Sequence, residues 1–251
     1  MSLLEGIKKI SIADIFTLSN GIFGLMAVWS FIVFNPDITL GTGMIFLGMI
    51  CDGADGFMAR KFGSKHEYGR YLDSISDSIT FGLAPGVLIY IRYSSYPGFH
   101  IFATITALTI VAFSWIRLYV FTVQGYKFTA FHGLATPGMT FFVLVISHIL
   151  VPKDAINVIL ALSLSFMSAI MMVMFRVRYP KIRGKPAIAT ALGIVIALIF
   201  LQYLRITNVF GTNFTVWIYR IITFLGLGII AVYIFISPVY EMYLLRGEGH
   251  E

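Results

Sequence analysis

The sequence predicts an all-α polytopic membrane protein with about eight transmembrane helices, and three observations support this fold class. Of the 251 residues, 58% are hydrophobic and only 12% are charged, which leaves too little polar surface for a soluble domain. Most apolar runs are about 20 residues long, the length that a helix needs to cross a bilayer. Turn-forming residues such as proline, glycine and asparagine separate these runs.

Each apolar run is expected to form one helix of a single membrane domain over residues 1–251, because no linker is long enough to hold a soluble domain. Residues 1–14 are expected to form an N-terminal segment at the membrane interface. A core of six helices over 15–178 is then followed by two additional helices within 186–236. The eight runs cover residues 15–34, 38–59, 72–91, 99–122, 135–151, 155–175, 186–204 and 216–236.

The positive charges predict that both termini are cytoplasmic. In that orientation only Arg92, Lys153 and Arg205 fall in outer loops, as the positive-inside rule requires. The net charge of +6 then reflects topology, and no nucleic-acid partner is expected. We expect a protein of the cytoplasmic membrane. The inner lysines and arginines are Lys8, Lys9, Arg60, Lys61, Lys65, Arg70, Lys127, Arg176, Arg178, Lys181, Arg183, Lys185 and Arg246.

Four of the seven aspartates lie within 26 residues, at Asp52, Asp55, Asp73 and Asp77. Their spacings of three and four place each pair on one face of a helix. A carboxylate at membrane depth is costly, and four in one small volume require cations to neutralise them. Oxygen ligands suit Mg²⁺ or Mn²⁺. The cluster therefore predicts a metal site that holds two divalent ions at the cytoplasmic side of the membrane.

The same segment has the pattern DxxDGxxARx8GxxxDxxxD, which resembles the signature of the CDP-alcohol phosphotransferases at every fixed position. The resemblance implies a family-like helix bundle, a catalytic role for 15–178 and a homodimer. It implies that Asp52, Asp55 and Asp73 bind metal, while Asp77 completes the site and acts as general base. The implied reaction transfers a substituted phosphate from a CDP-linked lipid to an alcohol and releases CMP.

The other fixed positions of the pattern are expected to bind the nucleotide and its phosphates. Gly56, Ala59 and Gly69 lack bulk, so that a nucleotide can approach the backbone of both helices. Arg60 offers a planar fork suited to phosphate oxygens.

Segments outside this pattern resemble the phosphatidylserine synthase branch of the family. Ser78–Pro85 is similar to a DxxSFGxAP run, with Thr80 in place of the usual serine. The entry to the first helix is also similar, and it makes Thr17 and Asn20 candidates for nucleotide contact. Arg117 and the segment Phe131–Pro137 match two further runs of that branch, in which Val120, Thr122 and Ala135 depart from the common residues.

This resemblance implies L-serine as the acceptor and CDP-diacylglycerol or CDP-archaeol as the lipid donor. Arg117 is expected to neutralise the serine carboxylate, because an arginine at membrane depth needs an anionic partner. Pairing of Arg117 with a motif aspartate, or its extension to the interface, remains an alternative. Thr80 and His132 are further candidates for contact with the acceptor.

Other functions remain open from the sequence alone. The same reaction could use inositol phosphate or glycerol phosphate as acceptor. An intramembrane prenyltransferase also binds a pyrophosphate through magnesium, although its aspartate motifs lie far apart in the chain. A divalent-cation transporter is a third alternative, but the apolar residues that follow Asp77 offer no polar pathway across the membrane.

Overall fold

The computed structural model describes residues 11–35, 38–62, 67–124, 131–174 and 178–179. Apart from one two-residue strand pair, the regular structure in these ranges is helical. Its elements are α2 (Ile12–Val33), α3 (Thr39–Phe62), α4 (Glu67–Asp77), the π-helix η1 (Ser78–Leu83), α5 (Ala84–Tyr93), α6 (His100–Gln124), β1 (Phe131–His132), α7 (Thr136–Ile149), α8 (Ala155–Val173) and β2 (Arg178–Tyr179).

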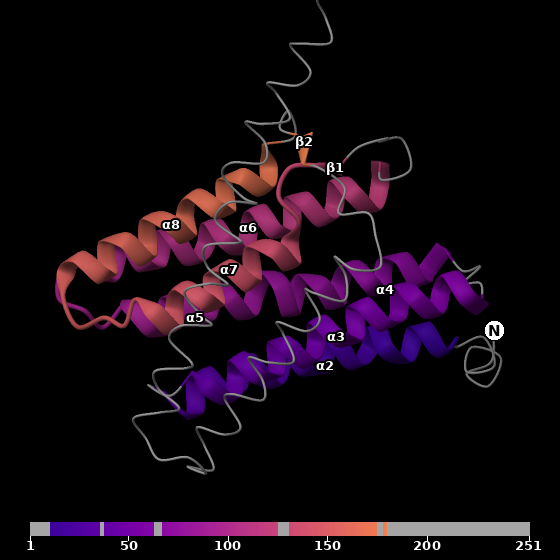
Figure 1. Cartoon of the computed structure of the whole chain (residues 1–251), viewed down its shortest axis with the longest axis horizontal. Helices are drawn as coiled ribbons and strands as arrows, with labels where there is room; N and C mark the ends of the chain where they lie inside the picture. Colours follow the sequence, from indigo (N-terminus) through magenta and orange to yellow (C-terminus); the bar gives the residue numbers. More distant parts are fainter. Residues whose placement is uncertain (1–10, 36–37, 63–66, 125–130, 175–177, 180–251) are drawn as a thin grey trace, which may run out of the picture.

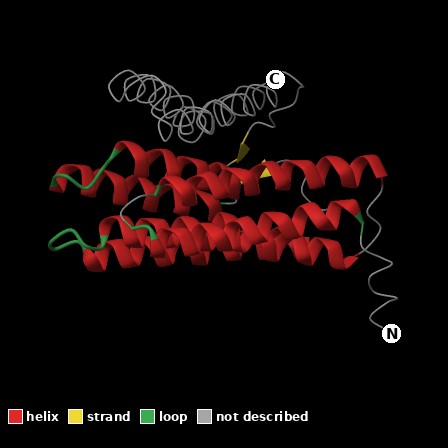
Figure 2. Cartoon of the chain, turned by 90° about the horizontal axis from the view of Figure 1, so that it is seen from below, coloured by secondary structure: helices red, strands yellow, loops and turns green. Residues whose placement is uncertain are grey.

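The helices lie side by side along one common direction (Figure 1, Figure 2). Helix α2 packs mainly against α3 and also against α4, η1 and α5. Helix α6 packs against α5 and α8, and also contacts η1. The continuous helical segment formed by α4, η1 and α5 therefore lies between the α2–α3 pair and the α6–α8 pair.

Within the described residues, four helical segments are long and apolar enough to cross a membrane: Ile12–Val33, Gly69–Tyr93, His100–Val123 and Ala155–Val173. Thr136–Ile149 is a shorter apolar helix. Helix α3 is less apolar because its second half carries four charged residues: Asp52, Asp55, Arg60 and Lys61. The all-α membrane fold is thus confirmed in its coarse form. The expected helices at 186–204 and 216–236 and both chain termini lie outside the described residues.

Helix α2 begins with a capping box at Ser11. The Ser11 backbone N–H donates to Asp14 Oδ2 at 2.8 Å, and the Asp14 N–H donates to Ser11 Oγ at 3.3 Å. These bonds satisfy backbone donors that the first turn of a helix otherwise leaves open. The last residues of the expected segment 1–14 therefore belong to α2, while residues 1–10 lie outside the described residues.

The polarity of α2 is the reverse of that of a helix in a soluble protein. Large apolar side chains such as Ile15, Ile22 and Trp29 are exposed, with 55%, 56% and 57% of their surface accessible. The buried face instead carries polar and small residues: Asp14, Thr17, Asn20, Gly21, Gly24, Ala27 and Ser30. Small residues let membrane helices approach closely, and buried polar groups mark functional sites. This pattern supports a lipid-facing outer surface and a polar interior.

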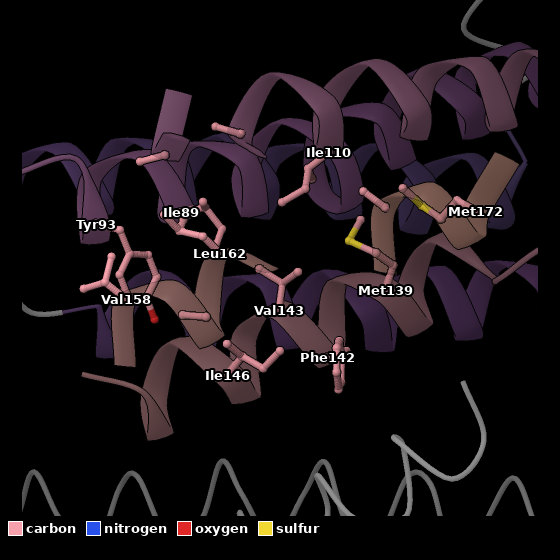
Figure 3. Packing of buried hydrophobic residues seen from close by; sticks show 14 of the residues in the cluster. Ile89, Tyr93, Ile110, Met139, Phe142, Val143, Ile146, Val158, Leu162 and Met172 are labelled. Atoms are coloured by element: carbon pink, nitrogen blue, oxygen red, sulfur yellow. The ribbon is translucent and has the colours of Figure 1, made fainter. Parts of the chain in front are cut away.

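The core between α5, α6, α7 and α8 is apolar and fully buried (Figure 3). Ile89 of α5, Ile110 of α6, Val143 of α7 and Val158 of α8 have no accessible surface. Tyr93 closes this core, and its hydroxyl donates to the Leu150 carbonyl at 2.8 Å. This packing fixes α6 and α7 relative to α5.

The π-helix η1 begins directly after Asp77, the last aspartate of the motif. A π-helix accommodates an extra residue in one turn, and such turns are common at functional sites. Thr80 of η1 sits tightly against α2 and α3, since a Cβ on Gly24 would overlap the Thr80 backbone and one on Gly48 would come within 2.7 Å of Thr80 Cγ2. These two glycines therefore allow η1 to pack against both helices.

Candidate active site

Three carboxylates from two helices meet at one point. Asp52 and Asp55 of α3 and Asp73 of α4 each offer an oxygen, and the three oxygens lie within 4.8 Å of one another. Asp55 is 7% exposed, while Asp52 and Asp73 are half-buried. Asp73 Oδ1 is buried and makes no hydrogen bond with the described residues. A buried carboxylate oxygen without a donor is suited to a cation, so the residues fit a hard divalent metal ion.

Asp77 lies beside this group at the end of α4 but is not one of the three whose oxygens meet. It is 8% exposed, and its Oδ1 accepts a hydrogen bond from Asn20 Nδ2 at 2.8 Å. Asp73 and Asp77 are four residues apart and both line the same cavity. Helix α4 therefore supplies Asp73 to the three-aspartate group and holds Asp77 beside that group.

Helix α2 contributes hydrogen-bond donors to this acidic site. Thr17 Oγ1 lies 2.7 Å from Asp55 Oδ2, and Asn20 Nδ2 holds Asp77 as described. Thr17 and Asn20 are three residues apart, so both project from the buried face of α2. Nucleotide contact was expected of them, whereas the observed partners are carboxylates of the motif.

The remaining motif residues flank the aspartates on α3 and α4. Gly56 follows Asp55 directly, and Ala59 and Arg60 belong to the last turns of α3. Gly69 belongs to the first turn of α4. The side chains of Ala59 and Arg60 lie outside the described part of the structure, so their expected phosphate contacts stay predictions.

A cavity of about 320 Å³ opens beside Asp73 and Asp77, between α4, α6 and the start of α7. Its apolar wall includes Leu118 and Phe121 of α6. Its polar wall carries both signs of charge and two hydroxyls, and consists of Arg70, Asp73, Ser74, Asp77, Arg117 and Thr122. A small molecule with both a cationic and an anionic group suits such a cavity better than an apolar ligand does.

Arg117 is held firmly in the wall of this cavity. It is 5% exposed, and its Nη1 donates to Thr136 Oγ1 at 2.8 Å. Its guanidinium carbon lies 4.5 Å from the centre of the Phe121 ring, a distance at which the ring face attracts a cation. Arg117 is therefore buried at the cavity and does not extend to the surface of the protein.

The structure places the other two expected acceptor residues differently. Thr80 has no accessible surface, and its hydroxyl donates to the Asn20 carbonyl at 2.8 Å, so it lies outside the cavity wall. His132 is in β1, where its backbone pairs with that of Arg178, and its side chain lies outside the described part of the structure.

The segment after β1 is fixed to the end of α8. Gly133 has a φ of +75°, and the Leu134 N–H donates to the Met171 carbonyl at 3.0 Å. A Cβ on Gly133 would overlap the Met172 carbonyl oxygen. This close approach positions Thr136, and through it Arg117, at the cavity.

Three polar residues of the cavity wall are not among the site residues that the sequence predicts: Arg70, Ser74 and Thr122. Arg70 and Ser74 are four residues apart on α4, and Ser74 Oγ is hydrogen-bonded to Thr122 Oγ1 of α6. The signal available for the two residues on α4 was their spacing, since Arg70 lies three residues before Asp73 and Ser74 three residues before Asp77, and residues three apart share a helix face.

Comparisons with known proteins agree with this geometry. The family model described as CDP-alcohol phosphatidyltransferase matches residues 10–177. The chain is similar to a CDP-diacylglycerol–serine O-phosphatidyltransferase of Methanocaldococcus jannaschii, with 31% identity over 178 residues that cover 71% of this chain and 78% of the relative. A Bacillus subtilis protein of the same description is 36% identical over 122 residues, or 48% of this chain and 66% of that protein.

An archaeal relative with a different lipid in its name is also similar. The archaetidylserine synthase of Methanothermobacter thermautotrophicus is 28% identical over 182 residues, which cover 71% of this chain and 73% of the relative. The family match spans the whole of the three-aspartate site and the cavity beside it. The chain therefore belongs to the CDP-alcohol phosphatidyltransferase family.

Proposed function

We infer that this protein transfers a phosphatidyl or archaetidyl group from CDP-diacylglycerol or CDP-archaeol to the hydroxyl of L-serine, in phospholipid biosynthesis. The observation that carries this function is the three-carboxylate group beside a cavity that holds Asp77 and Arg117. The named relatives support serine as the acceptor, since each of the three has serine in its name.

Asp52, Asp55 and Asp73 fit a divalent metal, and we propose Mg²⁺ or Mn²⁺, with two ions at the site once Asp77 takes part. Divalent ions held there would supply positive charge to the diphosphate of the CDP-lipid and so make its phosphorus more open to attack. Arg60 supports this arrangement because a guanidinium binds phosphate oxygens in a planar fork. Gly56, Ala59 and Gly69 leave room for the nucleotide.

The acceptor side follows from the charges of the cavity. The Arg117 guanidinium binds the serine carboxylate, which places the serine hydroxyl toward Asp77. Asp77 accepts the hydroxyl proton as the serine oxygen forms its bond to the lipid-side phosphorus. The bond between that phosphorus and the CMP oxygen breaks, so that CMP leaves with the electron pair. No covalent intermediate with the protein is required.

We propose further that the chain crosses the cytoplasmic membrane eight times, with both termini and the site on the cytoplasmic side. The distribution of lysine and arginine supports this orientation. A homodimer is also part of the proposal, on the basis of family resemblance. Membership in the family argues against the prenyltransferase and the cation transporter.

The decisive experiment is a CMP-release assay with purified protein, Mg²⁺ or Mn²⁺, either CDP-lipid, and a panel of alcohols. We expect release with L-serine and formation of the serine lipid. Release with inositol phosphate or glycerol phosphate but never with serine would overturn the acceptor and leave the reaction class standing. Asp77→Asn is expected to abolish turnover while CMP binding persists, and retained turnover in that variant would refute the general-base role.

A further inference from the structure

We propose that Asn20 is a positioning residue that fixes the orientation of the Asp77 carboxylate, and that Gly48 and Thr80 hold Asn20 in place. The inference rests on the proposed function, because it takes Asp77 as the group that accepts the serine proton. It gives α2 a role in catalysis although α2 supplies none of the four motif aspartates.

The contacts of Asn20 join three helical elements at one residue. Asn20 has no accessible surface, and its Nδ2 donates to Asp77 Oδ1 at 2.8 Å. Its backbone carbonyl accepts a hydrogen bond from Thr80 Oγ1, also at 2.8 Å. On the opposite side, a Cβ added to Gly48 would come within 2.9 Å of Asn20 Oδ1. The side chain is therefore confined between α3, the end of α4 and η1.

The chemistry of the pair fixes which way the amide faces. An ionised carboxylate only accepts hydrogen bonds, so the Asn20 amide must turn its NH₂ group toward Asp77. This leaves Asn20 Oδ1 against Gly48, where it is buried without a donor among the described residues. Such an unsatisfied oxygen is costly. The hydrogen bond to Asp77 is therefore made at the expense of a hydrogen bond to Asn20 Oδ1.

The hydrogen bond from the Asn20 amide occupies Asp77 Oδ1 and leaves Asp77 Oδ2 for the serine proton or an ion. It therefore holds the Asp77 carboxylate in one of its two possible orientations. Groups that orient a ligand or base in this way typically change activity by about 10–100-fold when they are removed. A residue that instead contacted the nucleotide would chiefly change its affinity.

The test compares variants of purified protein in the CMP-release assay, with whichever alcohol the wild-type protein accepts. Asn20→Leu removes the donor and keeps a side chain of similar size. For this variant we expect kcat to fall about 10–100-fold. The KM for the CDP-lipid and the Kd for CMP with Mn²⁺ should stay within about twofold of the wild-type values.

A further pair of variants tests the support of Asn20 without changing it. Gly48→Ala should lower kcat in the same way, because its Cβ displaces Asn20 and Thr80. Gly43→Ala is the matched control on the same helix, since a Cβ there meets nothing within 4 Å, and it should keep wild-type kcat.

Two outcomes would overturn the positioning role: unchanged kcat in Asn20→Leu, or a loss that appears only as weaker CMP binding. Should Asn20→Leu fail to fold, Gly48→Ala against Gly43→Ala decides the matter on its own. A wild-type protein that accepts another alcohol would refute serine as substrate but leave this test intact.

Discussion

Gly133 allows a sharp test of how the acceptor cavity is built, because Gly98 provides a matched control. Both glycines have a positive φ, +75° for Gly133 and +82° for Gly98. An alanine in that left-handed region costs about 1–2 kcal/mol at either position. The two differ in their surroundings, since a Cβ on Gly98 meets nothing within 4 Å, whereas one on Gly133 overlaps the Met172 carbonyl oxygen.

The larger loss of stability expected at Gly133 comes from overlap with backbone atoms, which cannot change rotamer as a side chain can. The added Cβ would also lie 3.2 Å from the Met172 carbonyl carbon and 3.5 Å from the Met171 carbonyl oxygen. Relief of such an overlap by small backbone shifts costs about 1–3 kcal/mol. Gly133→Ala should therefore lose about 2–5 kcal/mol in total, against about 1–2 kcal/mol for Gly98→Ala.

Thermal unfolding of both variants in the same detergent measures this difference. About 1 kcal/mol corresponds to about 2–4 °C in Tm for a chain of this size. Gly133→Ala should also raise the KM for serine, because it moves the segment whose Thr136 binds Arg117. Gly98→Ala should not, since Gly98 precedes α6 at the end away from the cavity. Equal Tm losses and equal serine KM values in the two variants would refute the reasoning.

The remaining predictions concern the metal and the acceptor. Removal of divalent ions with a chelator should abolish CMP release, and Mg²⁺ or Mn²⁺ should restore it; activity that persists in chelator would contradict the metal role of the carboxylates. Thr17→Val removes the donor at 2.7 Å from Asp55, so the Mn²⁺ concentration needed for half-maximal activity should rise by about 10–100-fold. An unchanged metal titration would show that Thr17 does not orient Asp55. Arg117→Leu should raise the KM for serine by about 10–150-fold, because it removes a charged hydrogen bond. The KM for the CDP-lipid should stay the same. Equal increases in both KM values would place Arg117 outside the acceptor subsite.

Much of the site could be predicted because its chemistry is local in sequence. Spacings of three and four residues place Asp52 beside Asp55 and Asp73 beside Asp77. Contact between the two helices does not follow from the spacing. In the structure the two helices bring three of the four carboxylates together. Four of the eight expected membrane helices correspond to described segments that are long and apolar enough to cross a membrane, because apolar run length is a direct physical requirement of the bilayer.

Contacts between distant segments could not be predicted from periodicity. Thr17 and Asn20 were recognised as polar residues on one face, but their partners lie 38 and 57 residues further along the chain. The start of α4 at Glu67 was also missed, because an apolar run marks the part of a helix that lies in lipid and not its polar first turns. The position of Thr80 away from the cavity depends on how η1 packs against α2.

The π-helical turn after Asp77 has a consequence for how this chain tolerates changes in length. A π-helix absorbs its extra residue in a wider turn, so deletion of one residue from Ser78–Leu83 would restore regular winding and leave α5 facing the same neighbours. A deletion at the start of α5 would instead turn the residues after it by about 100°, because an α-helix advances by that angle per residue. Leu88, Ile89 and Tyr93, all without accessible surface, would then face the wrong neighbours. The wide turn is therefore the place in this membrane span where the chain can change its length by one residue and still keep both halves in register.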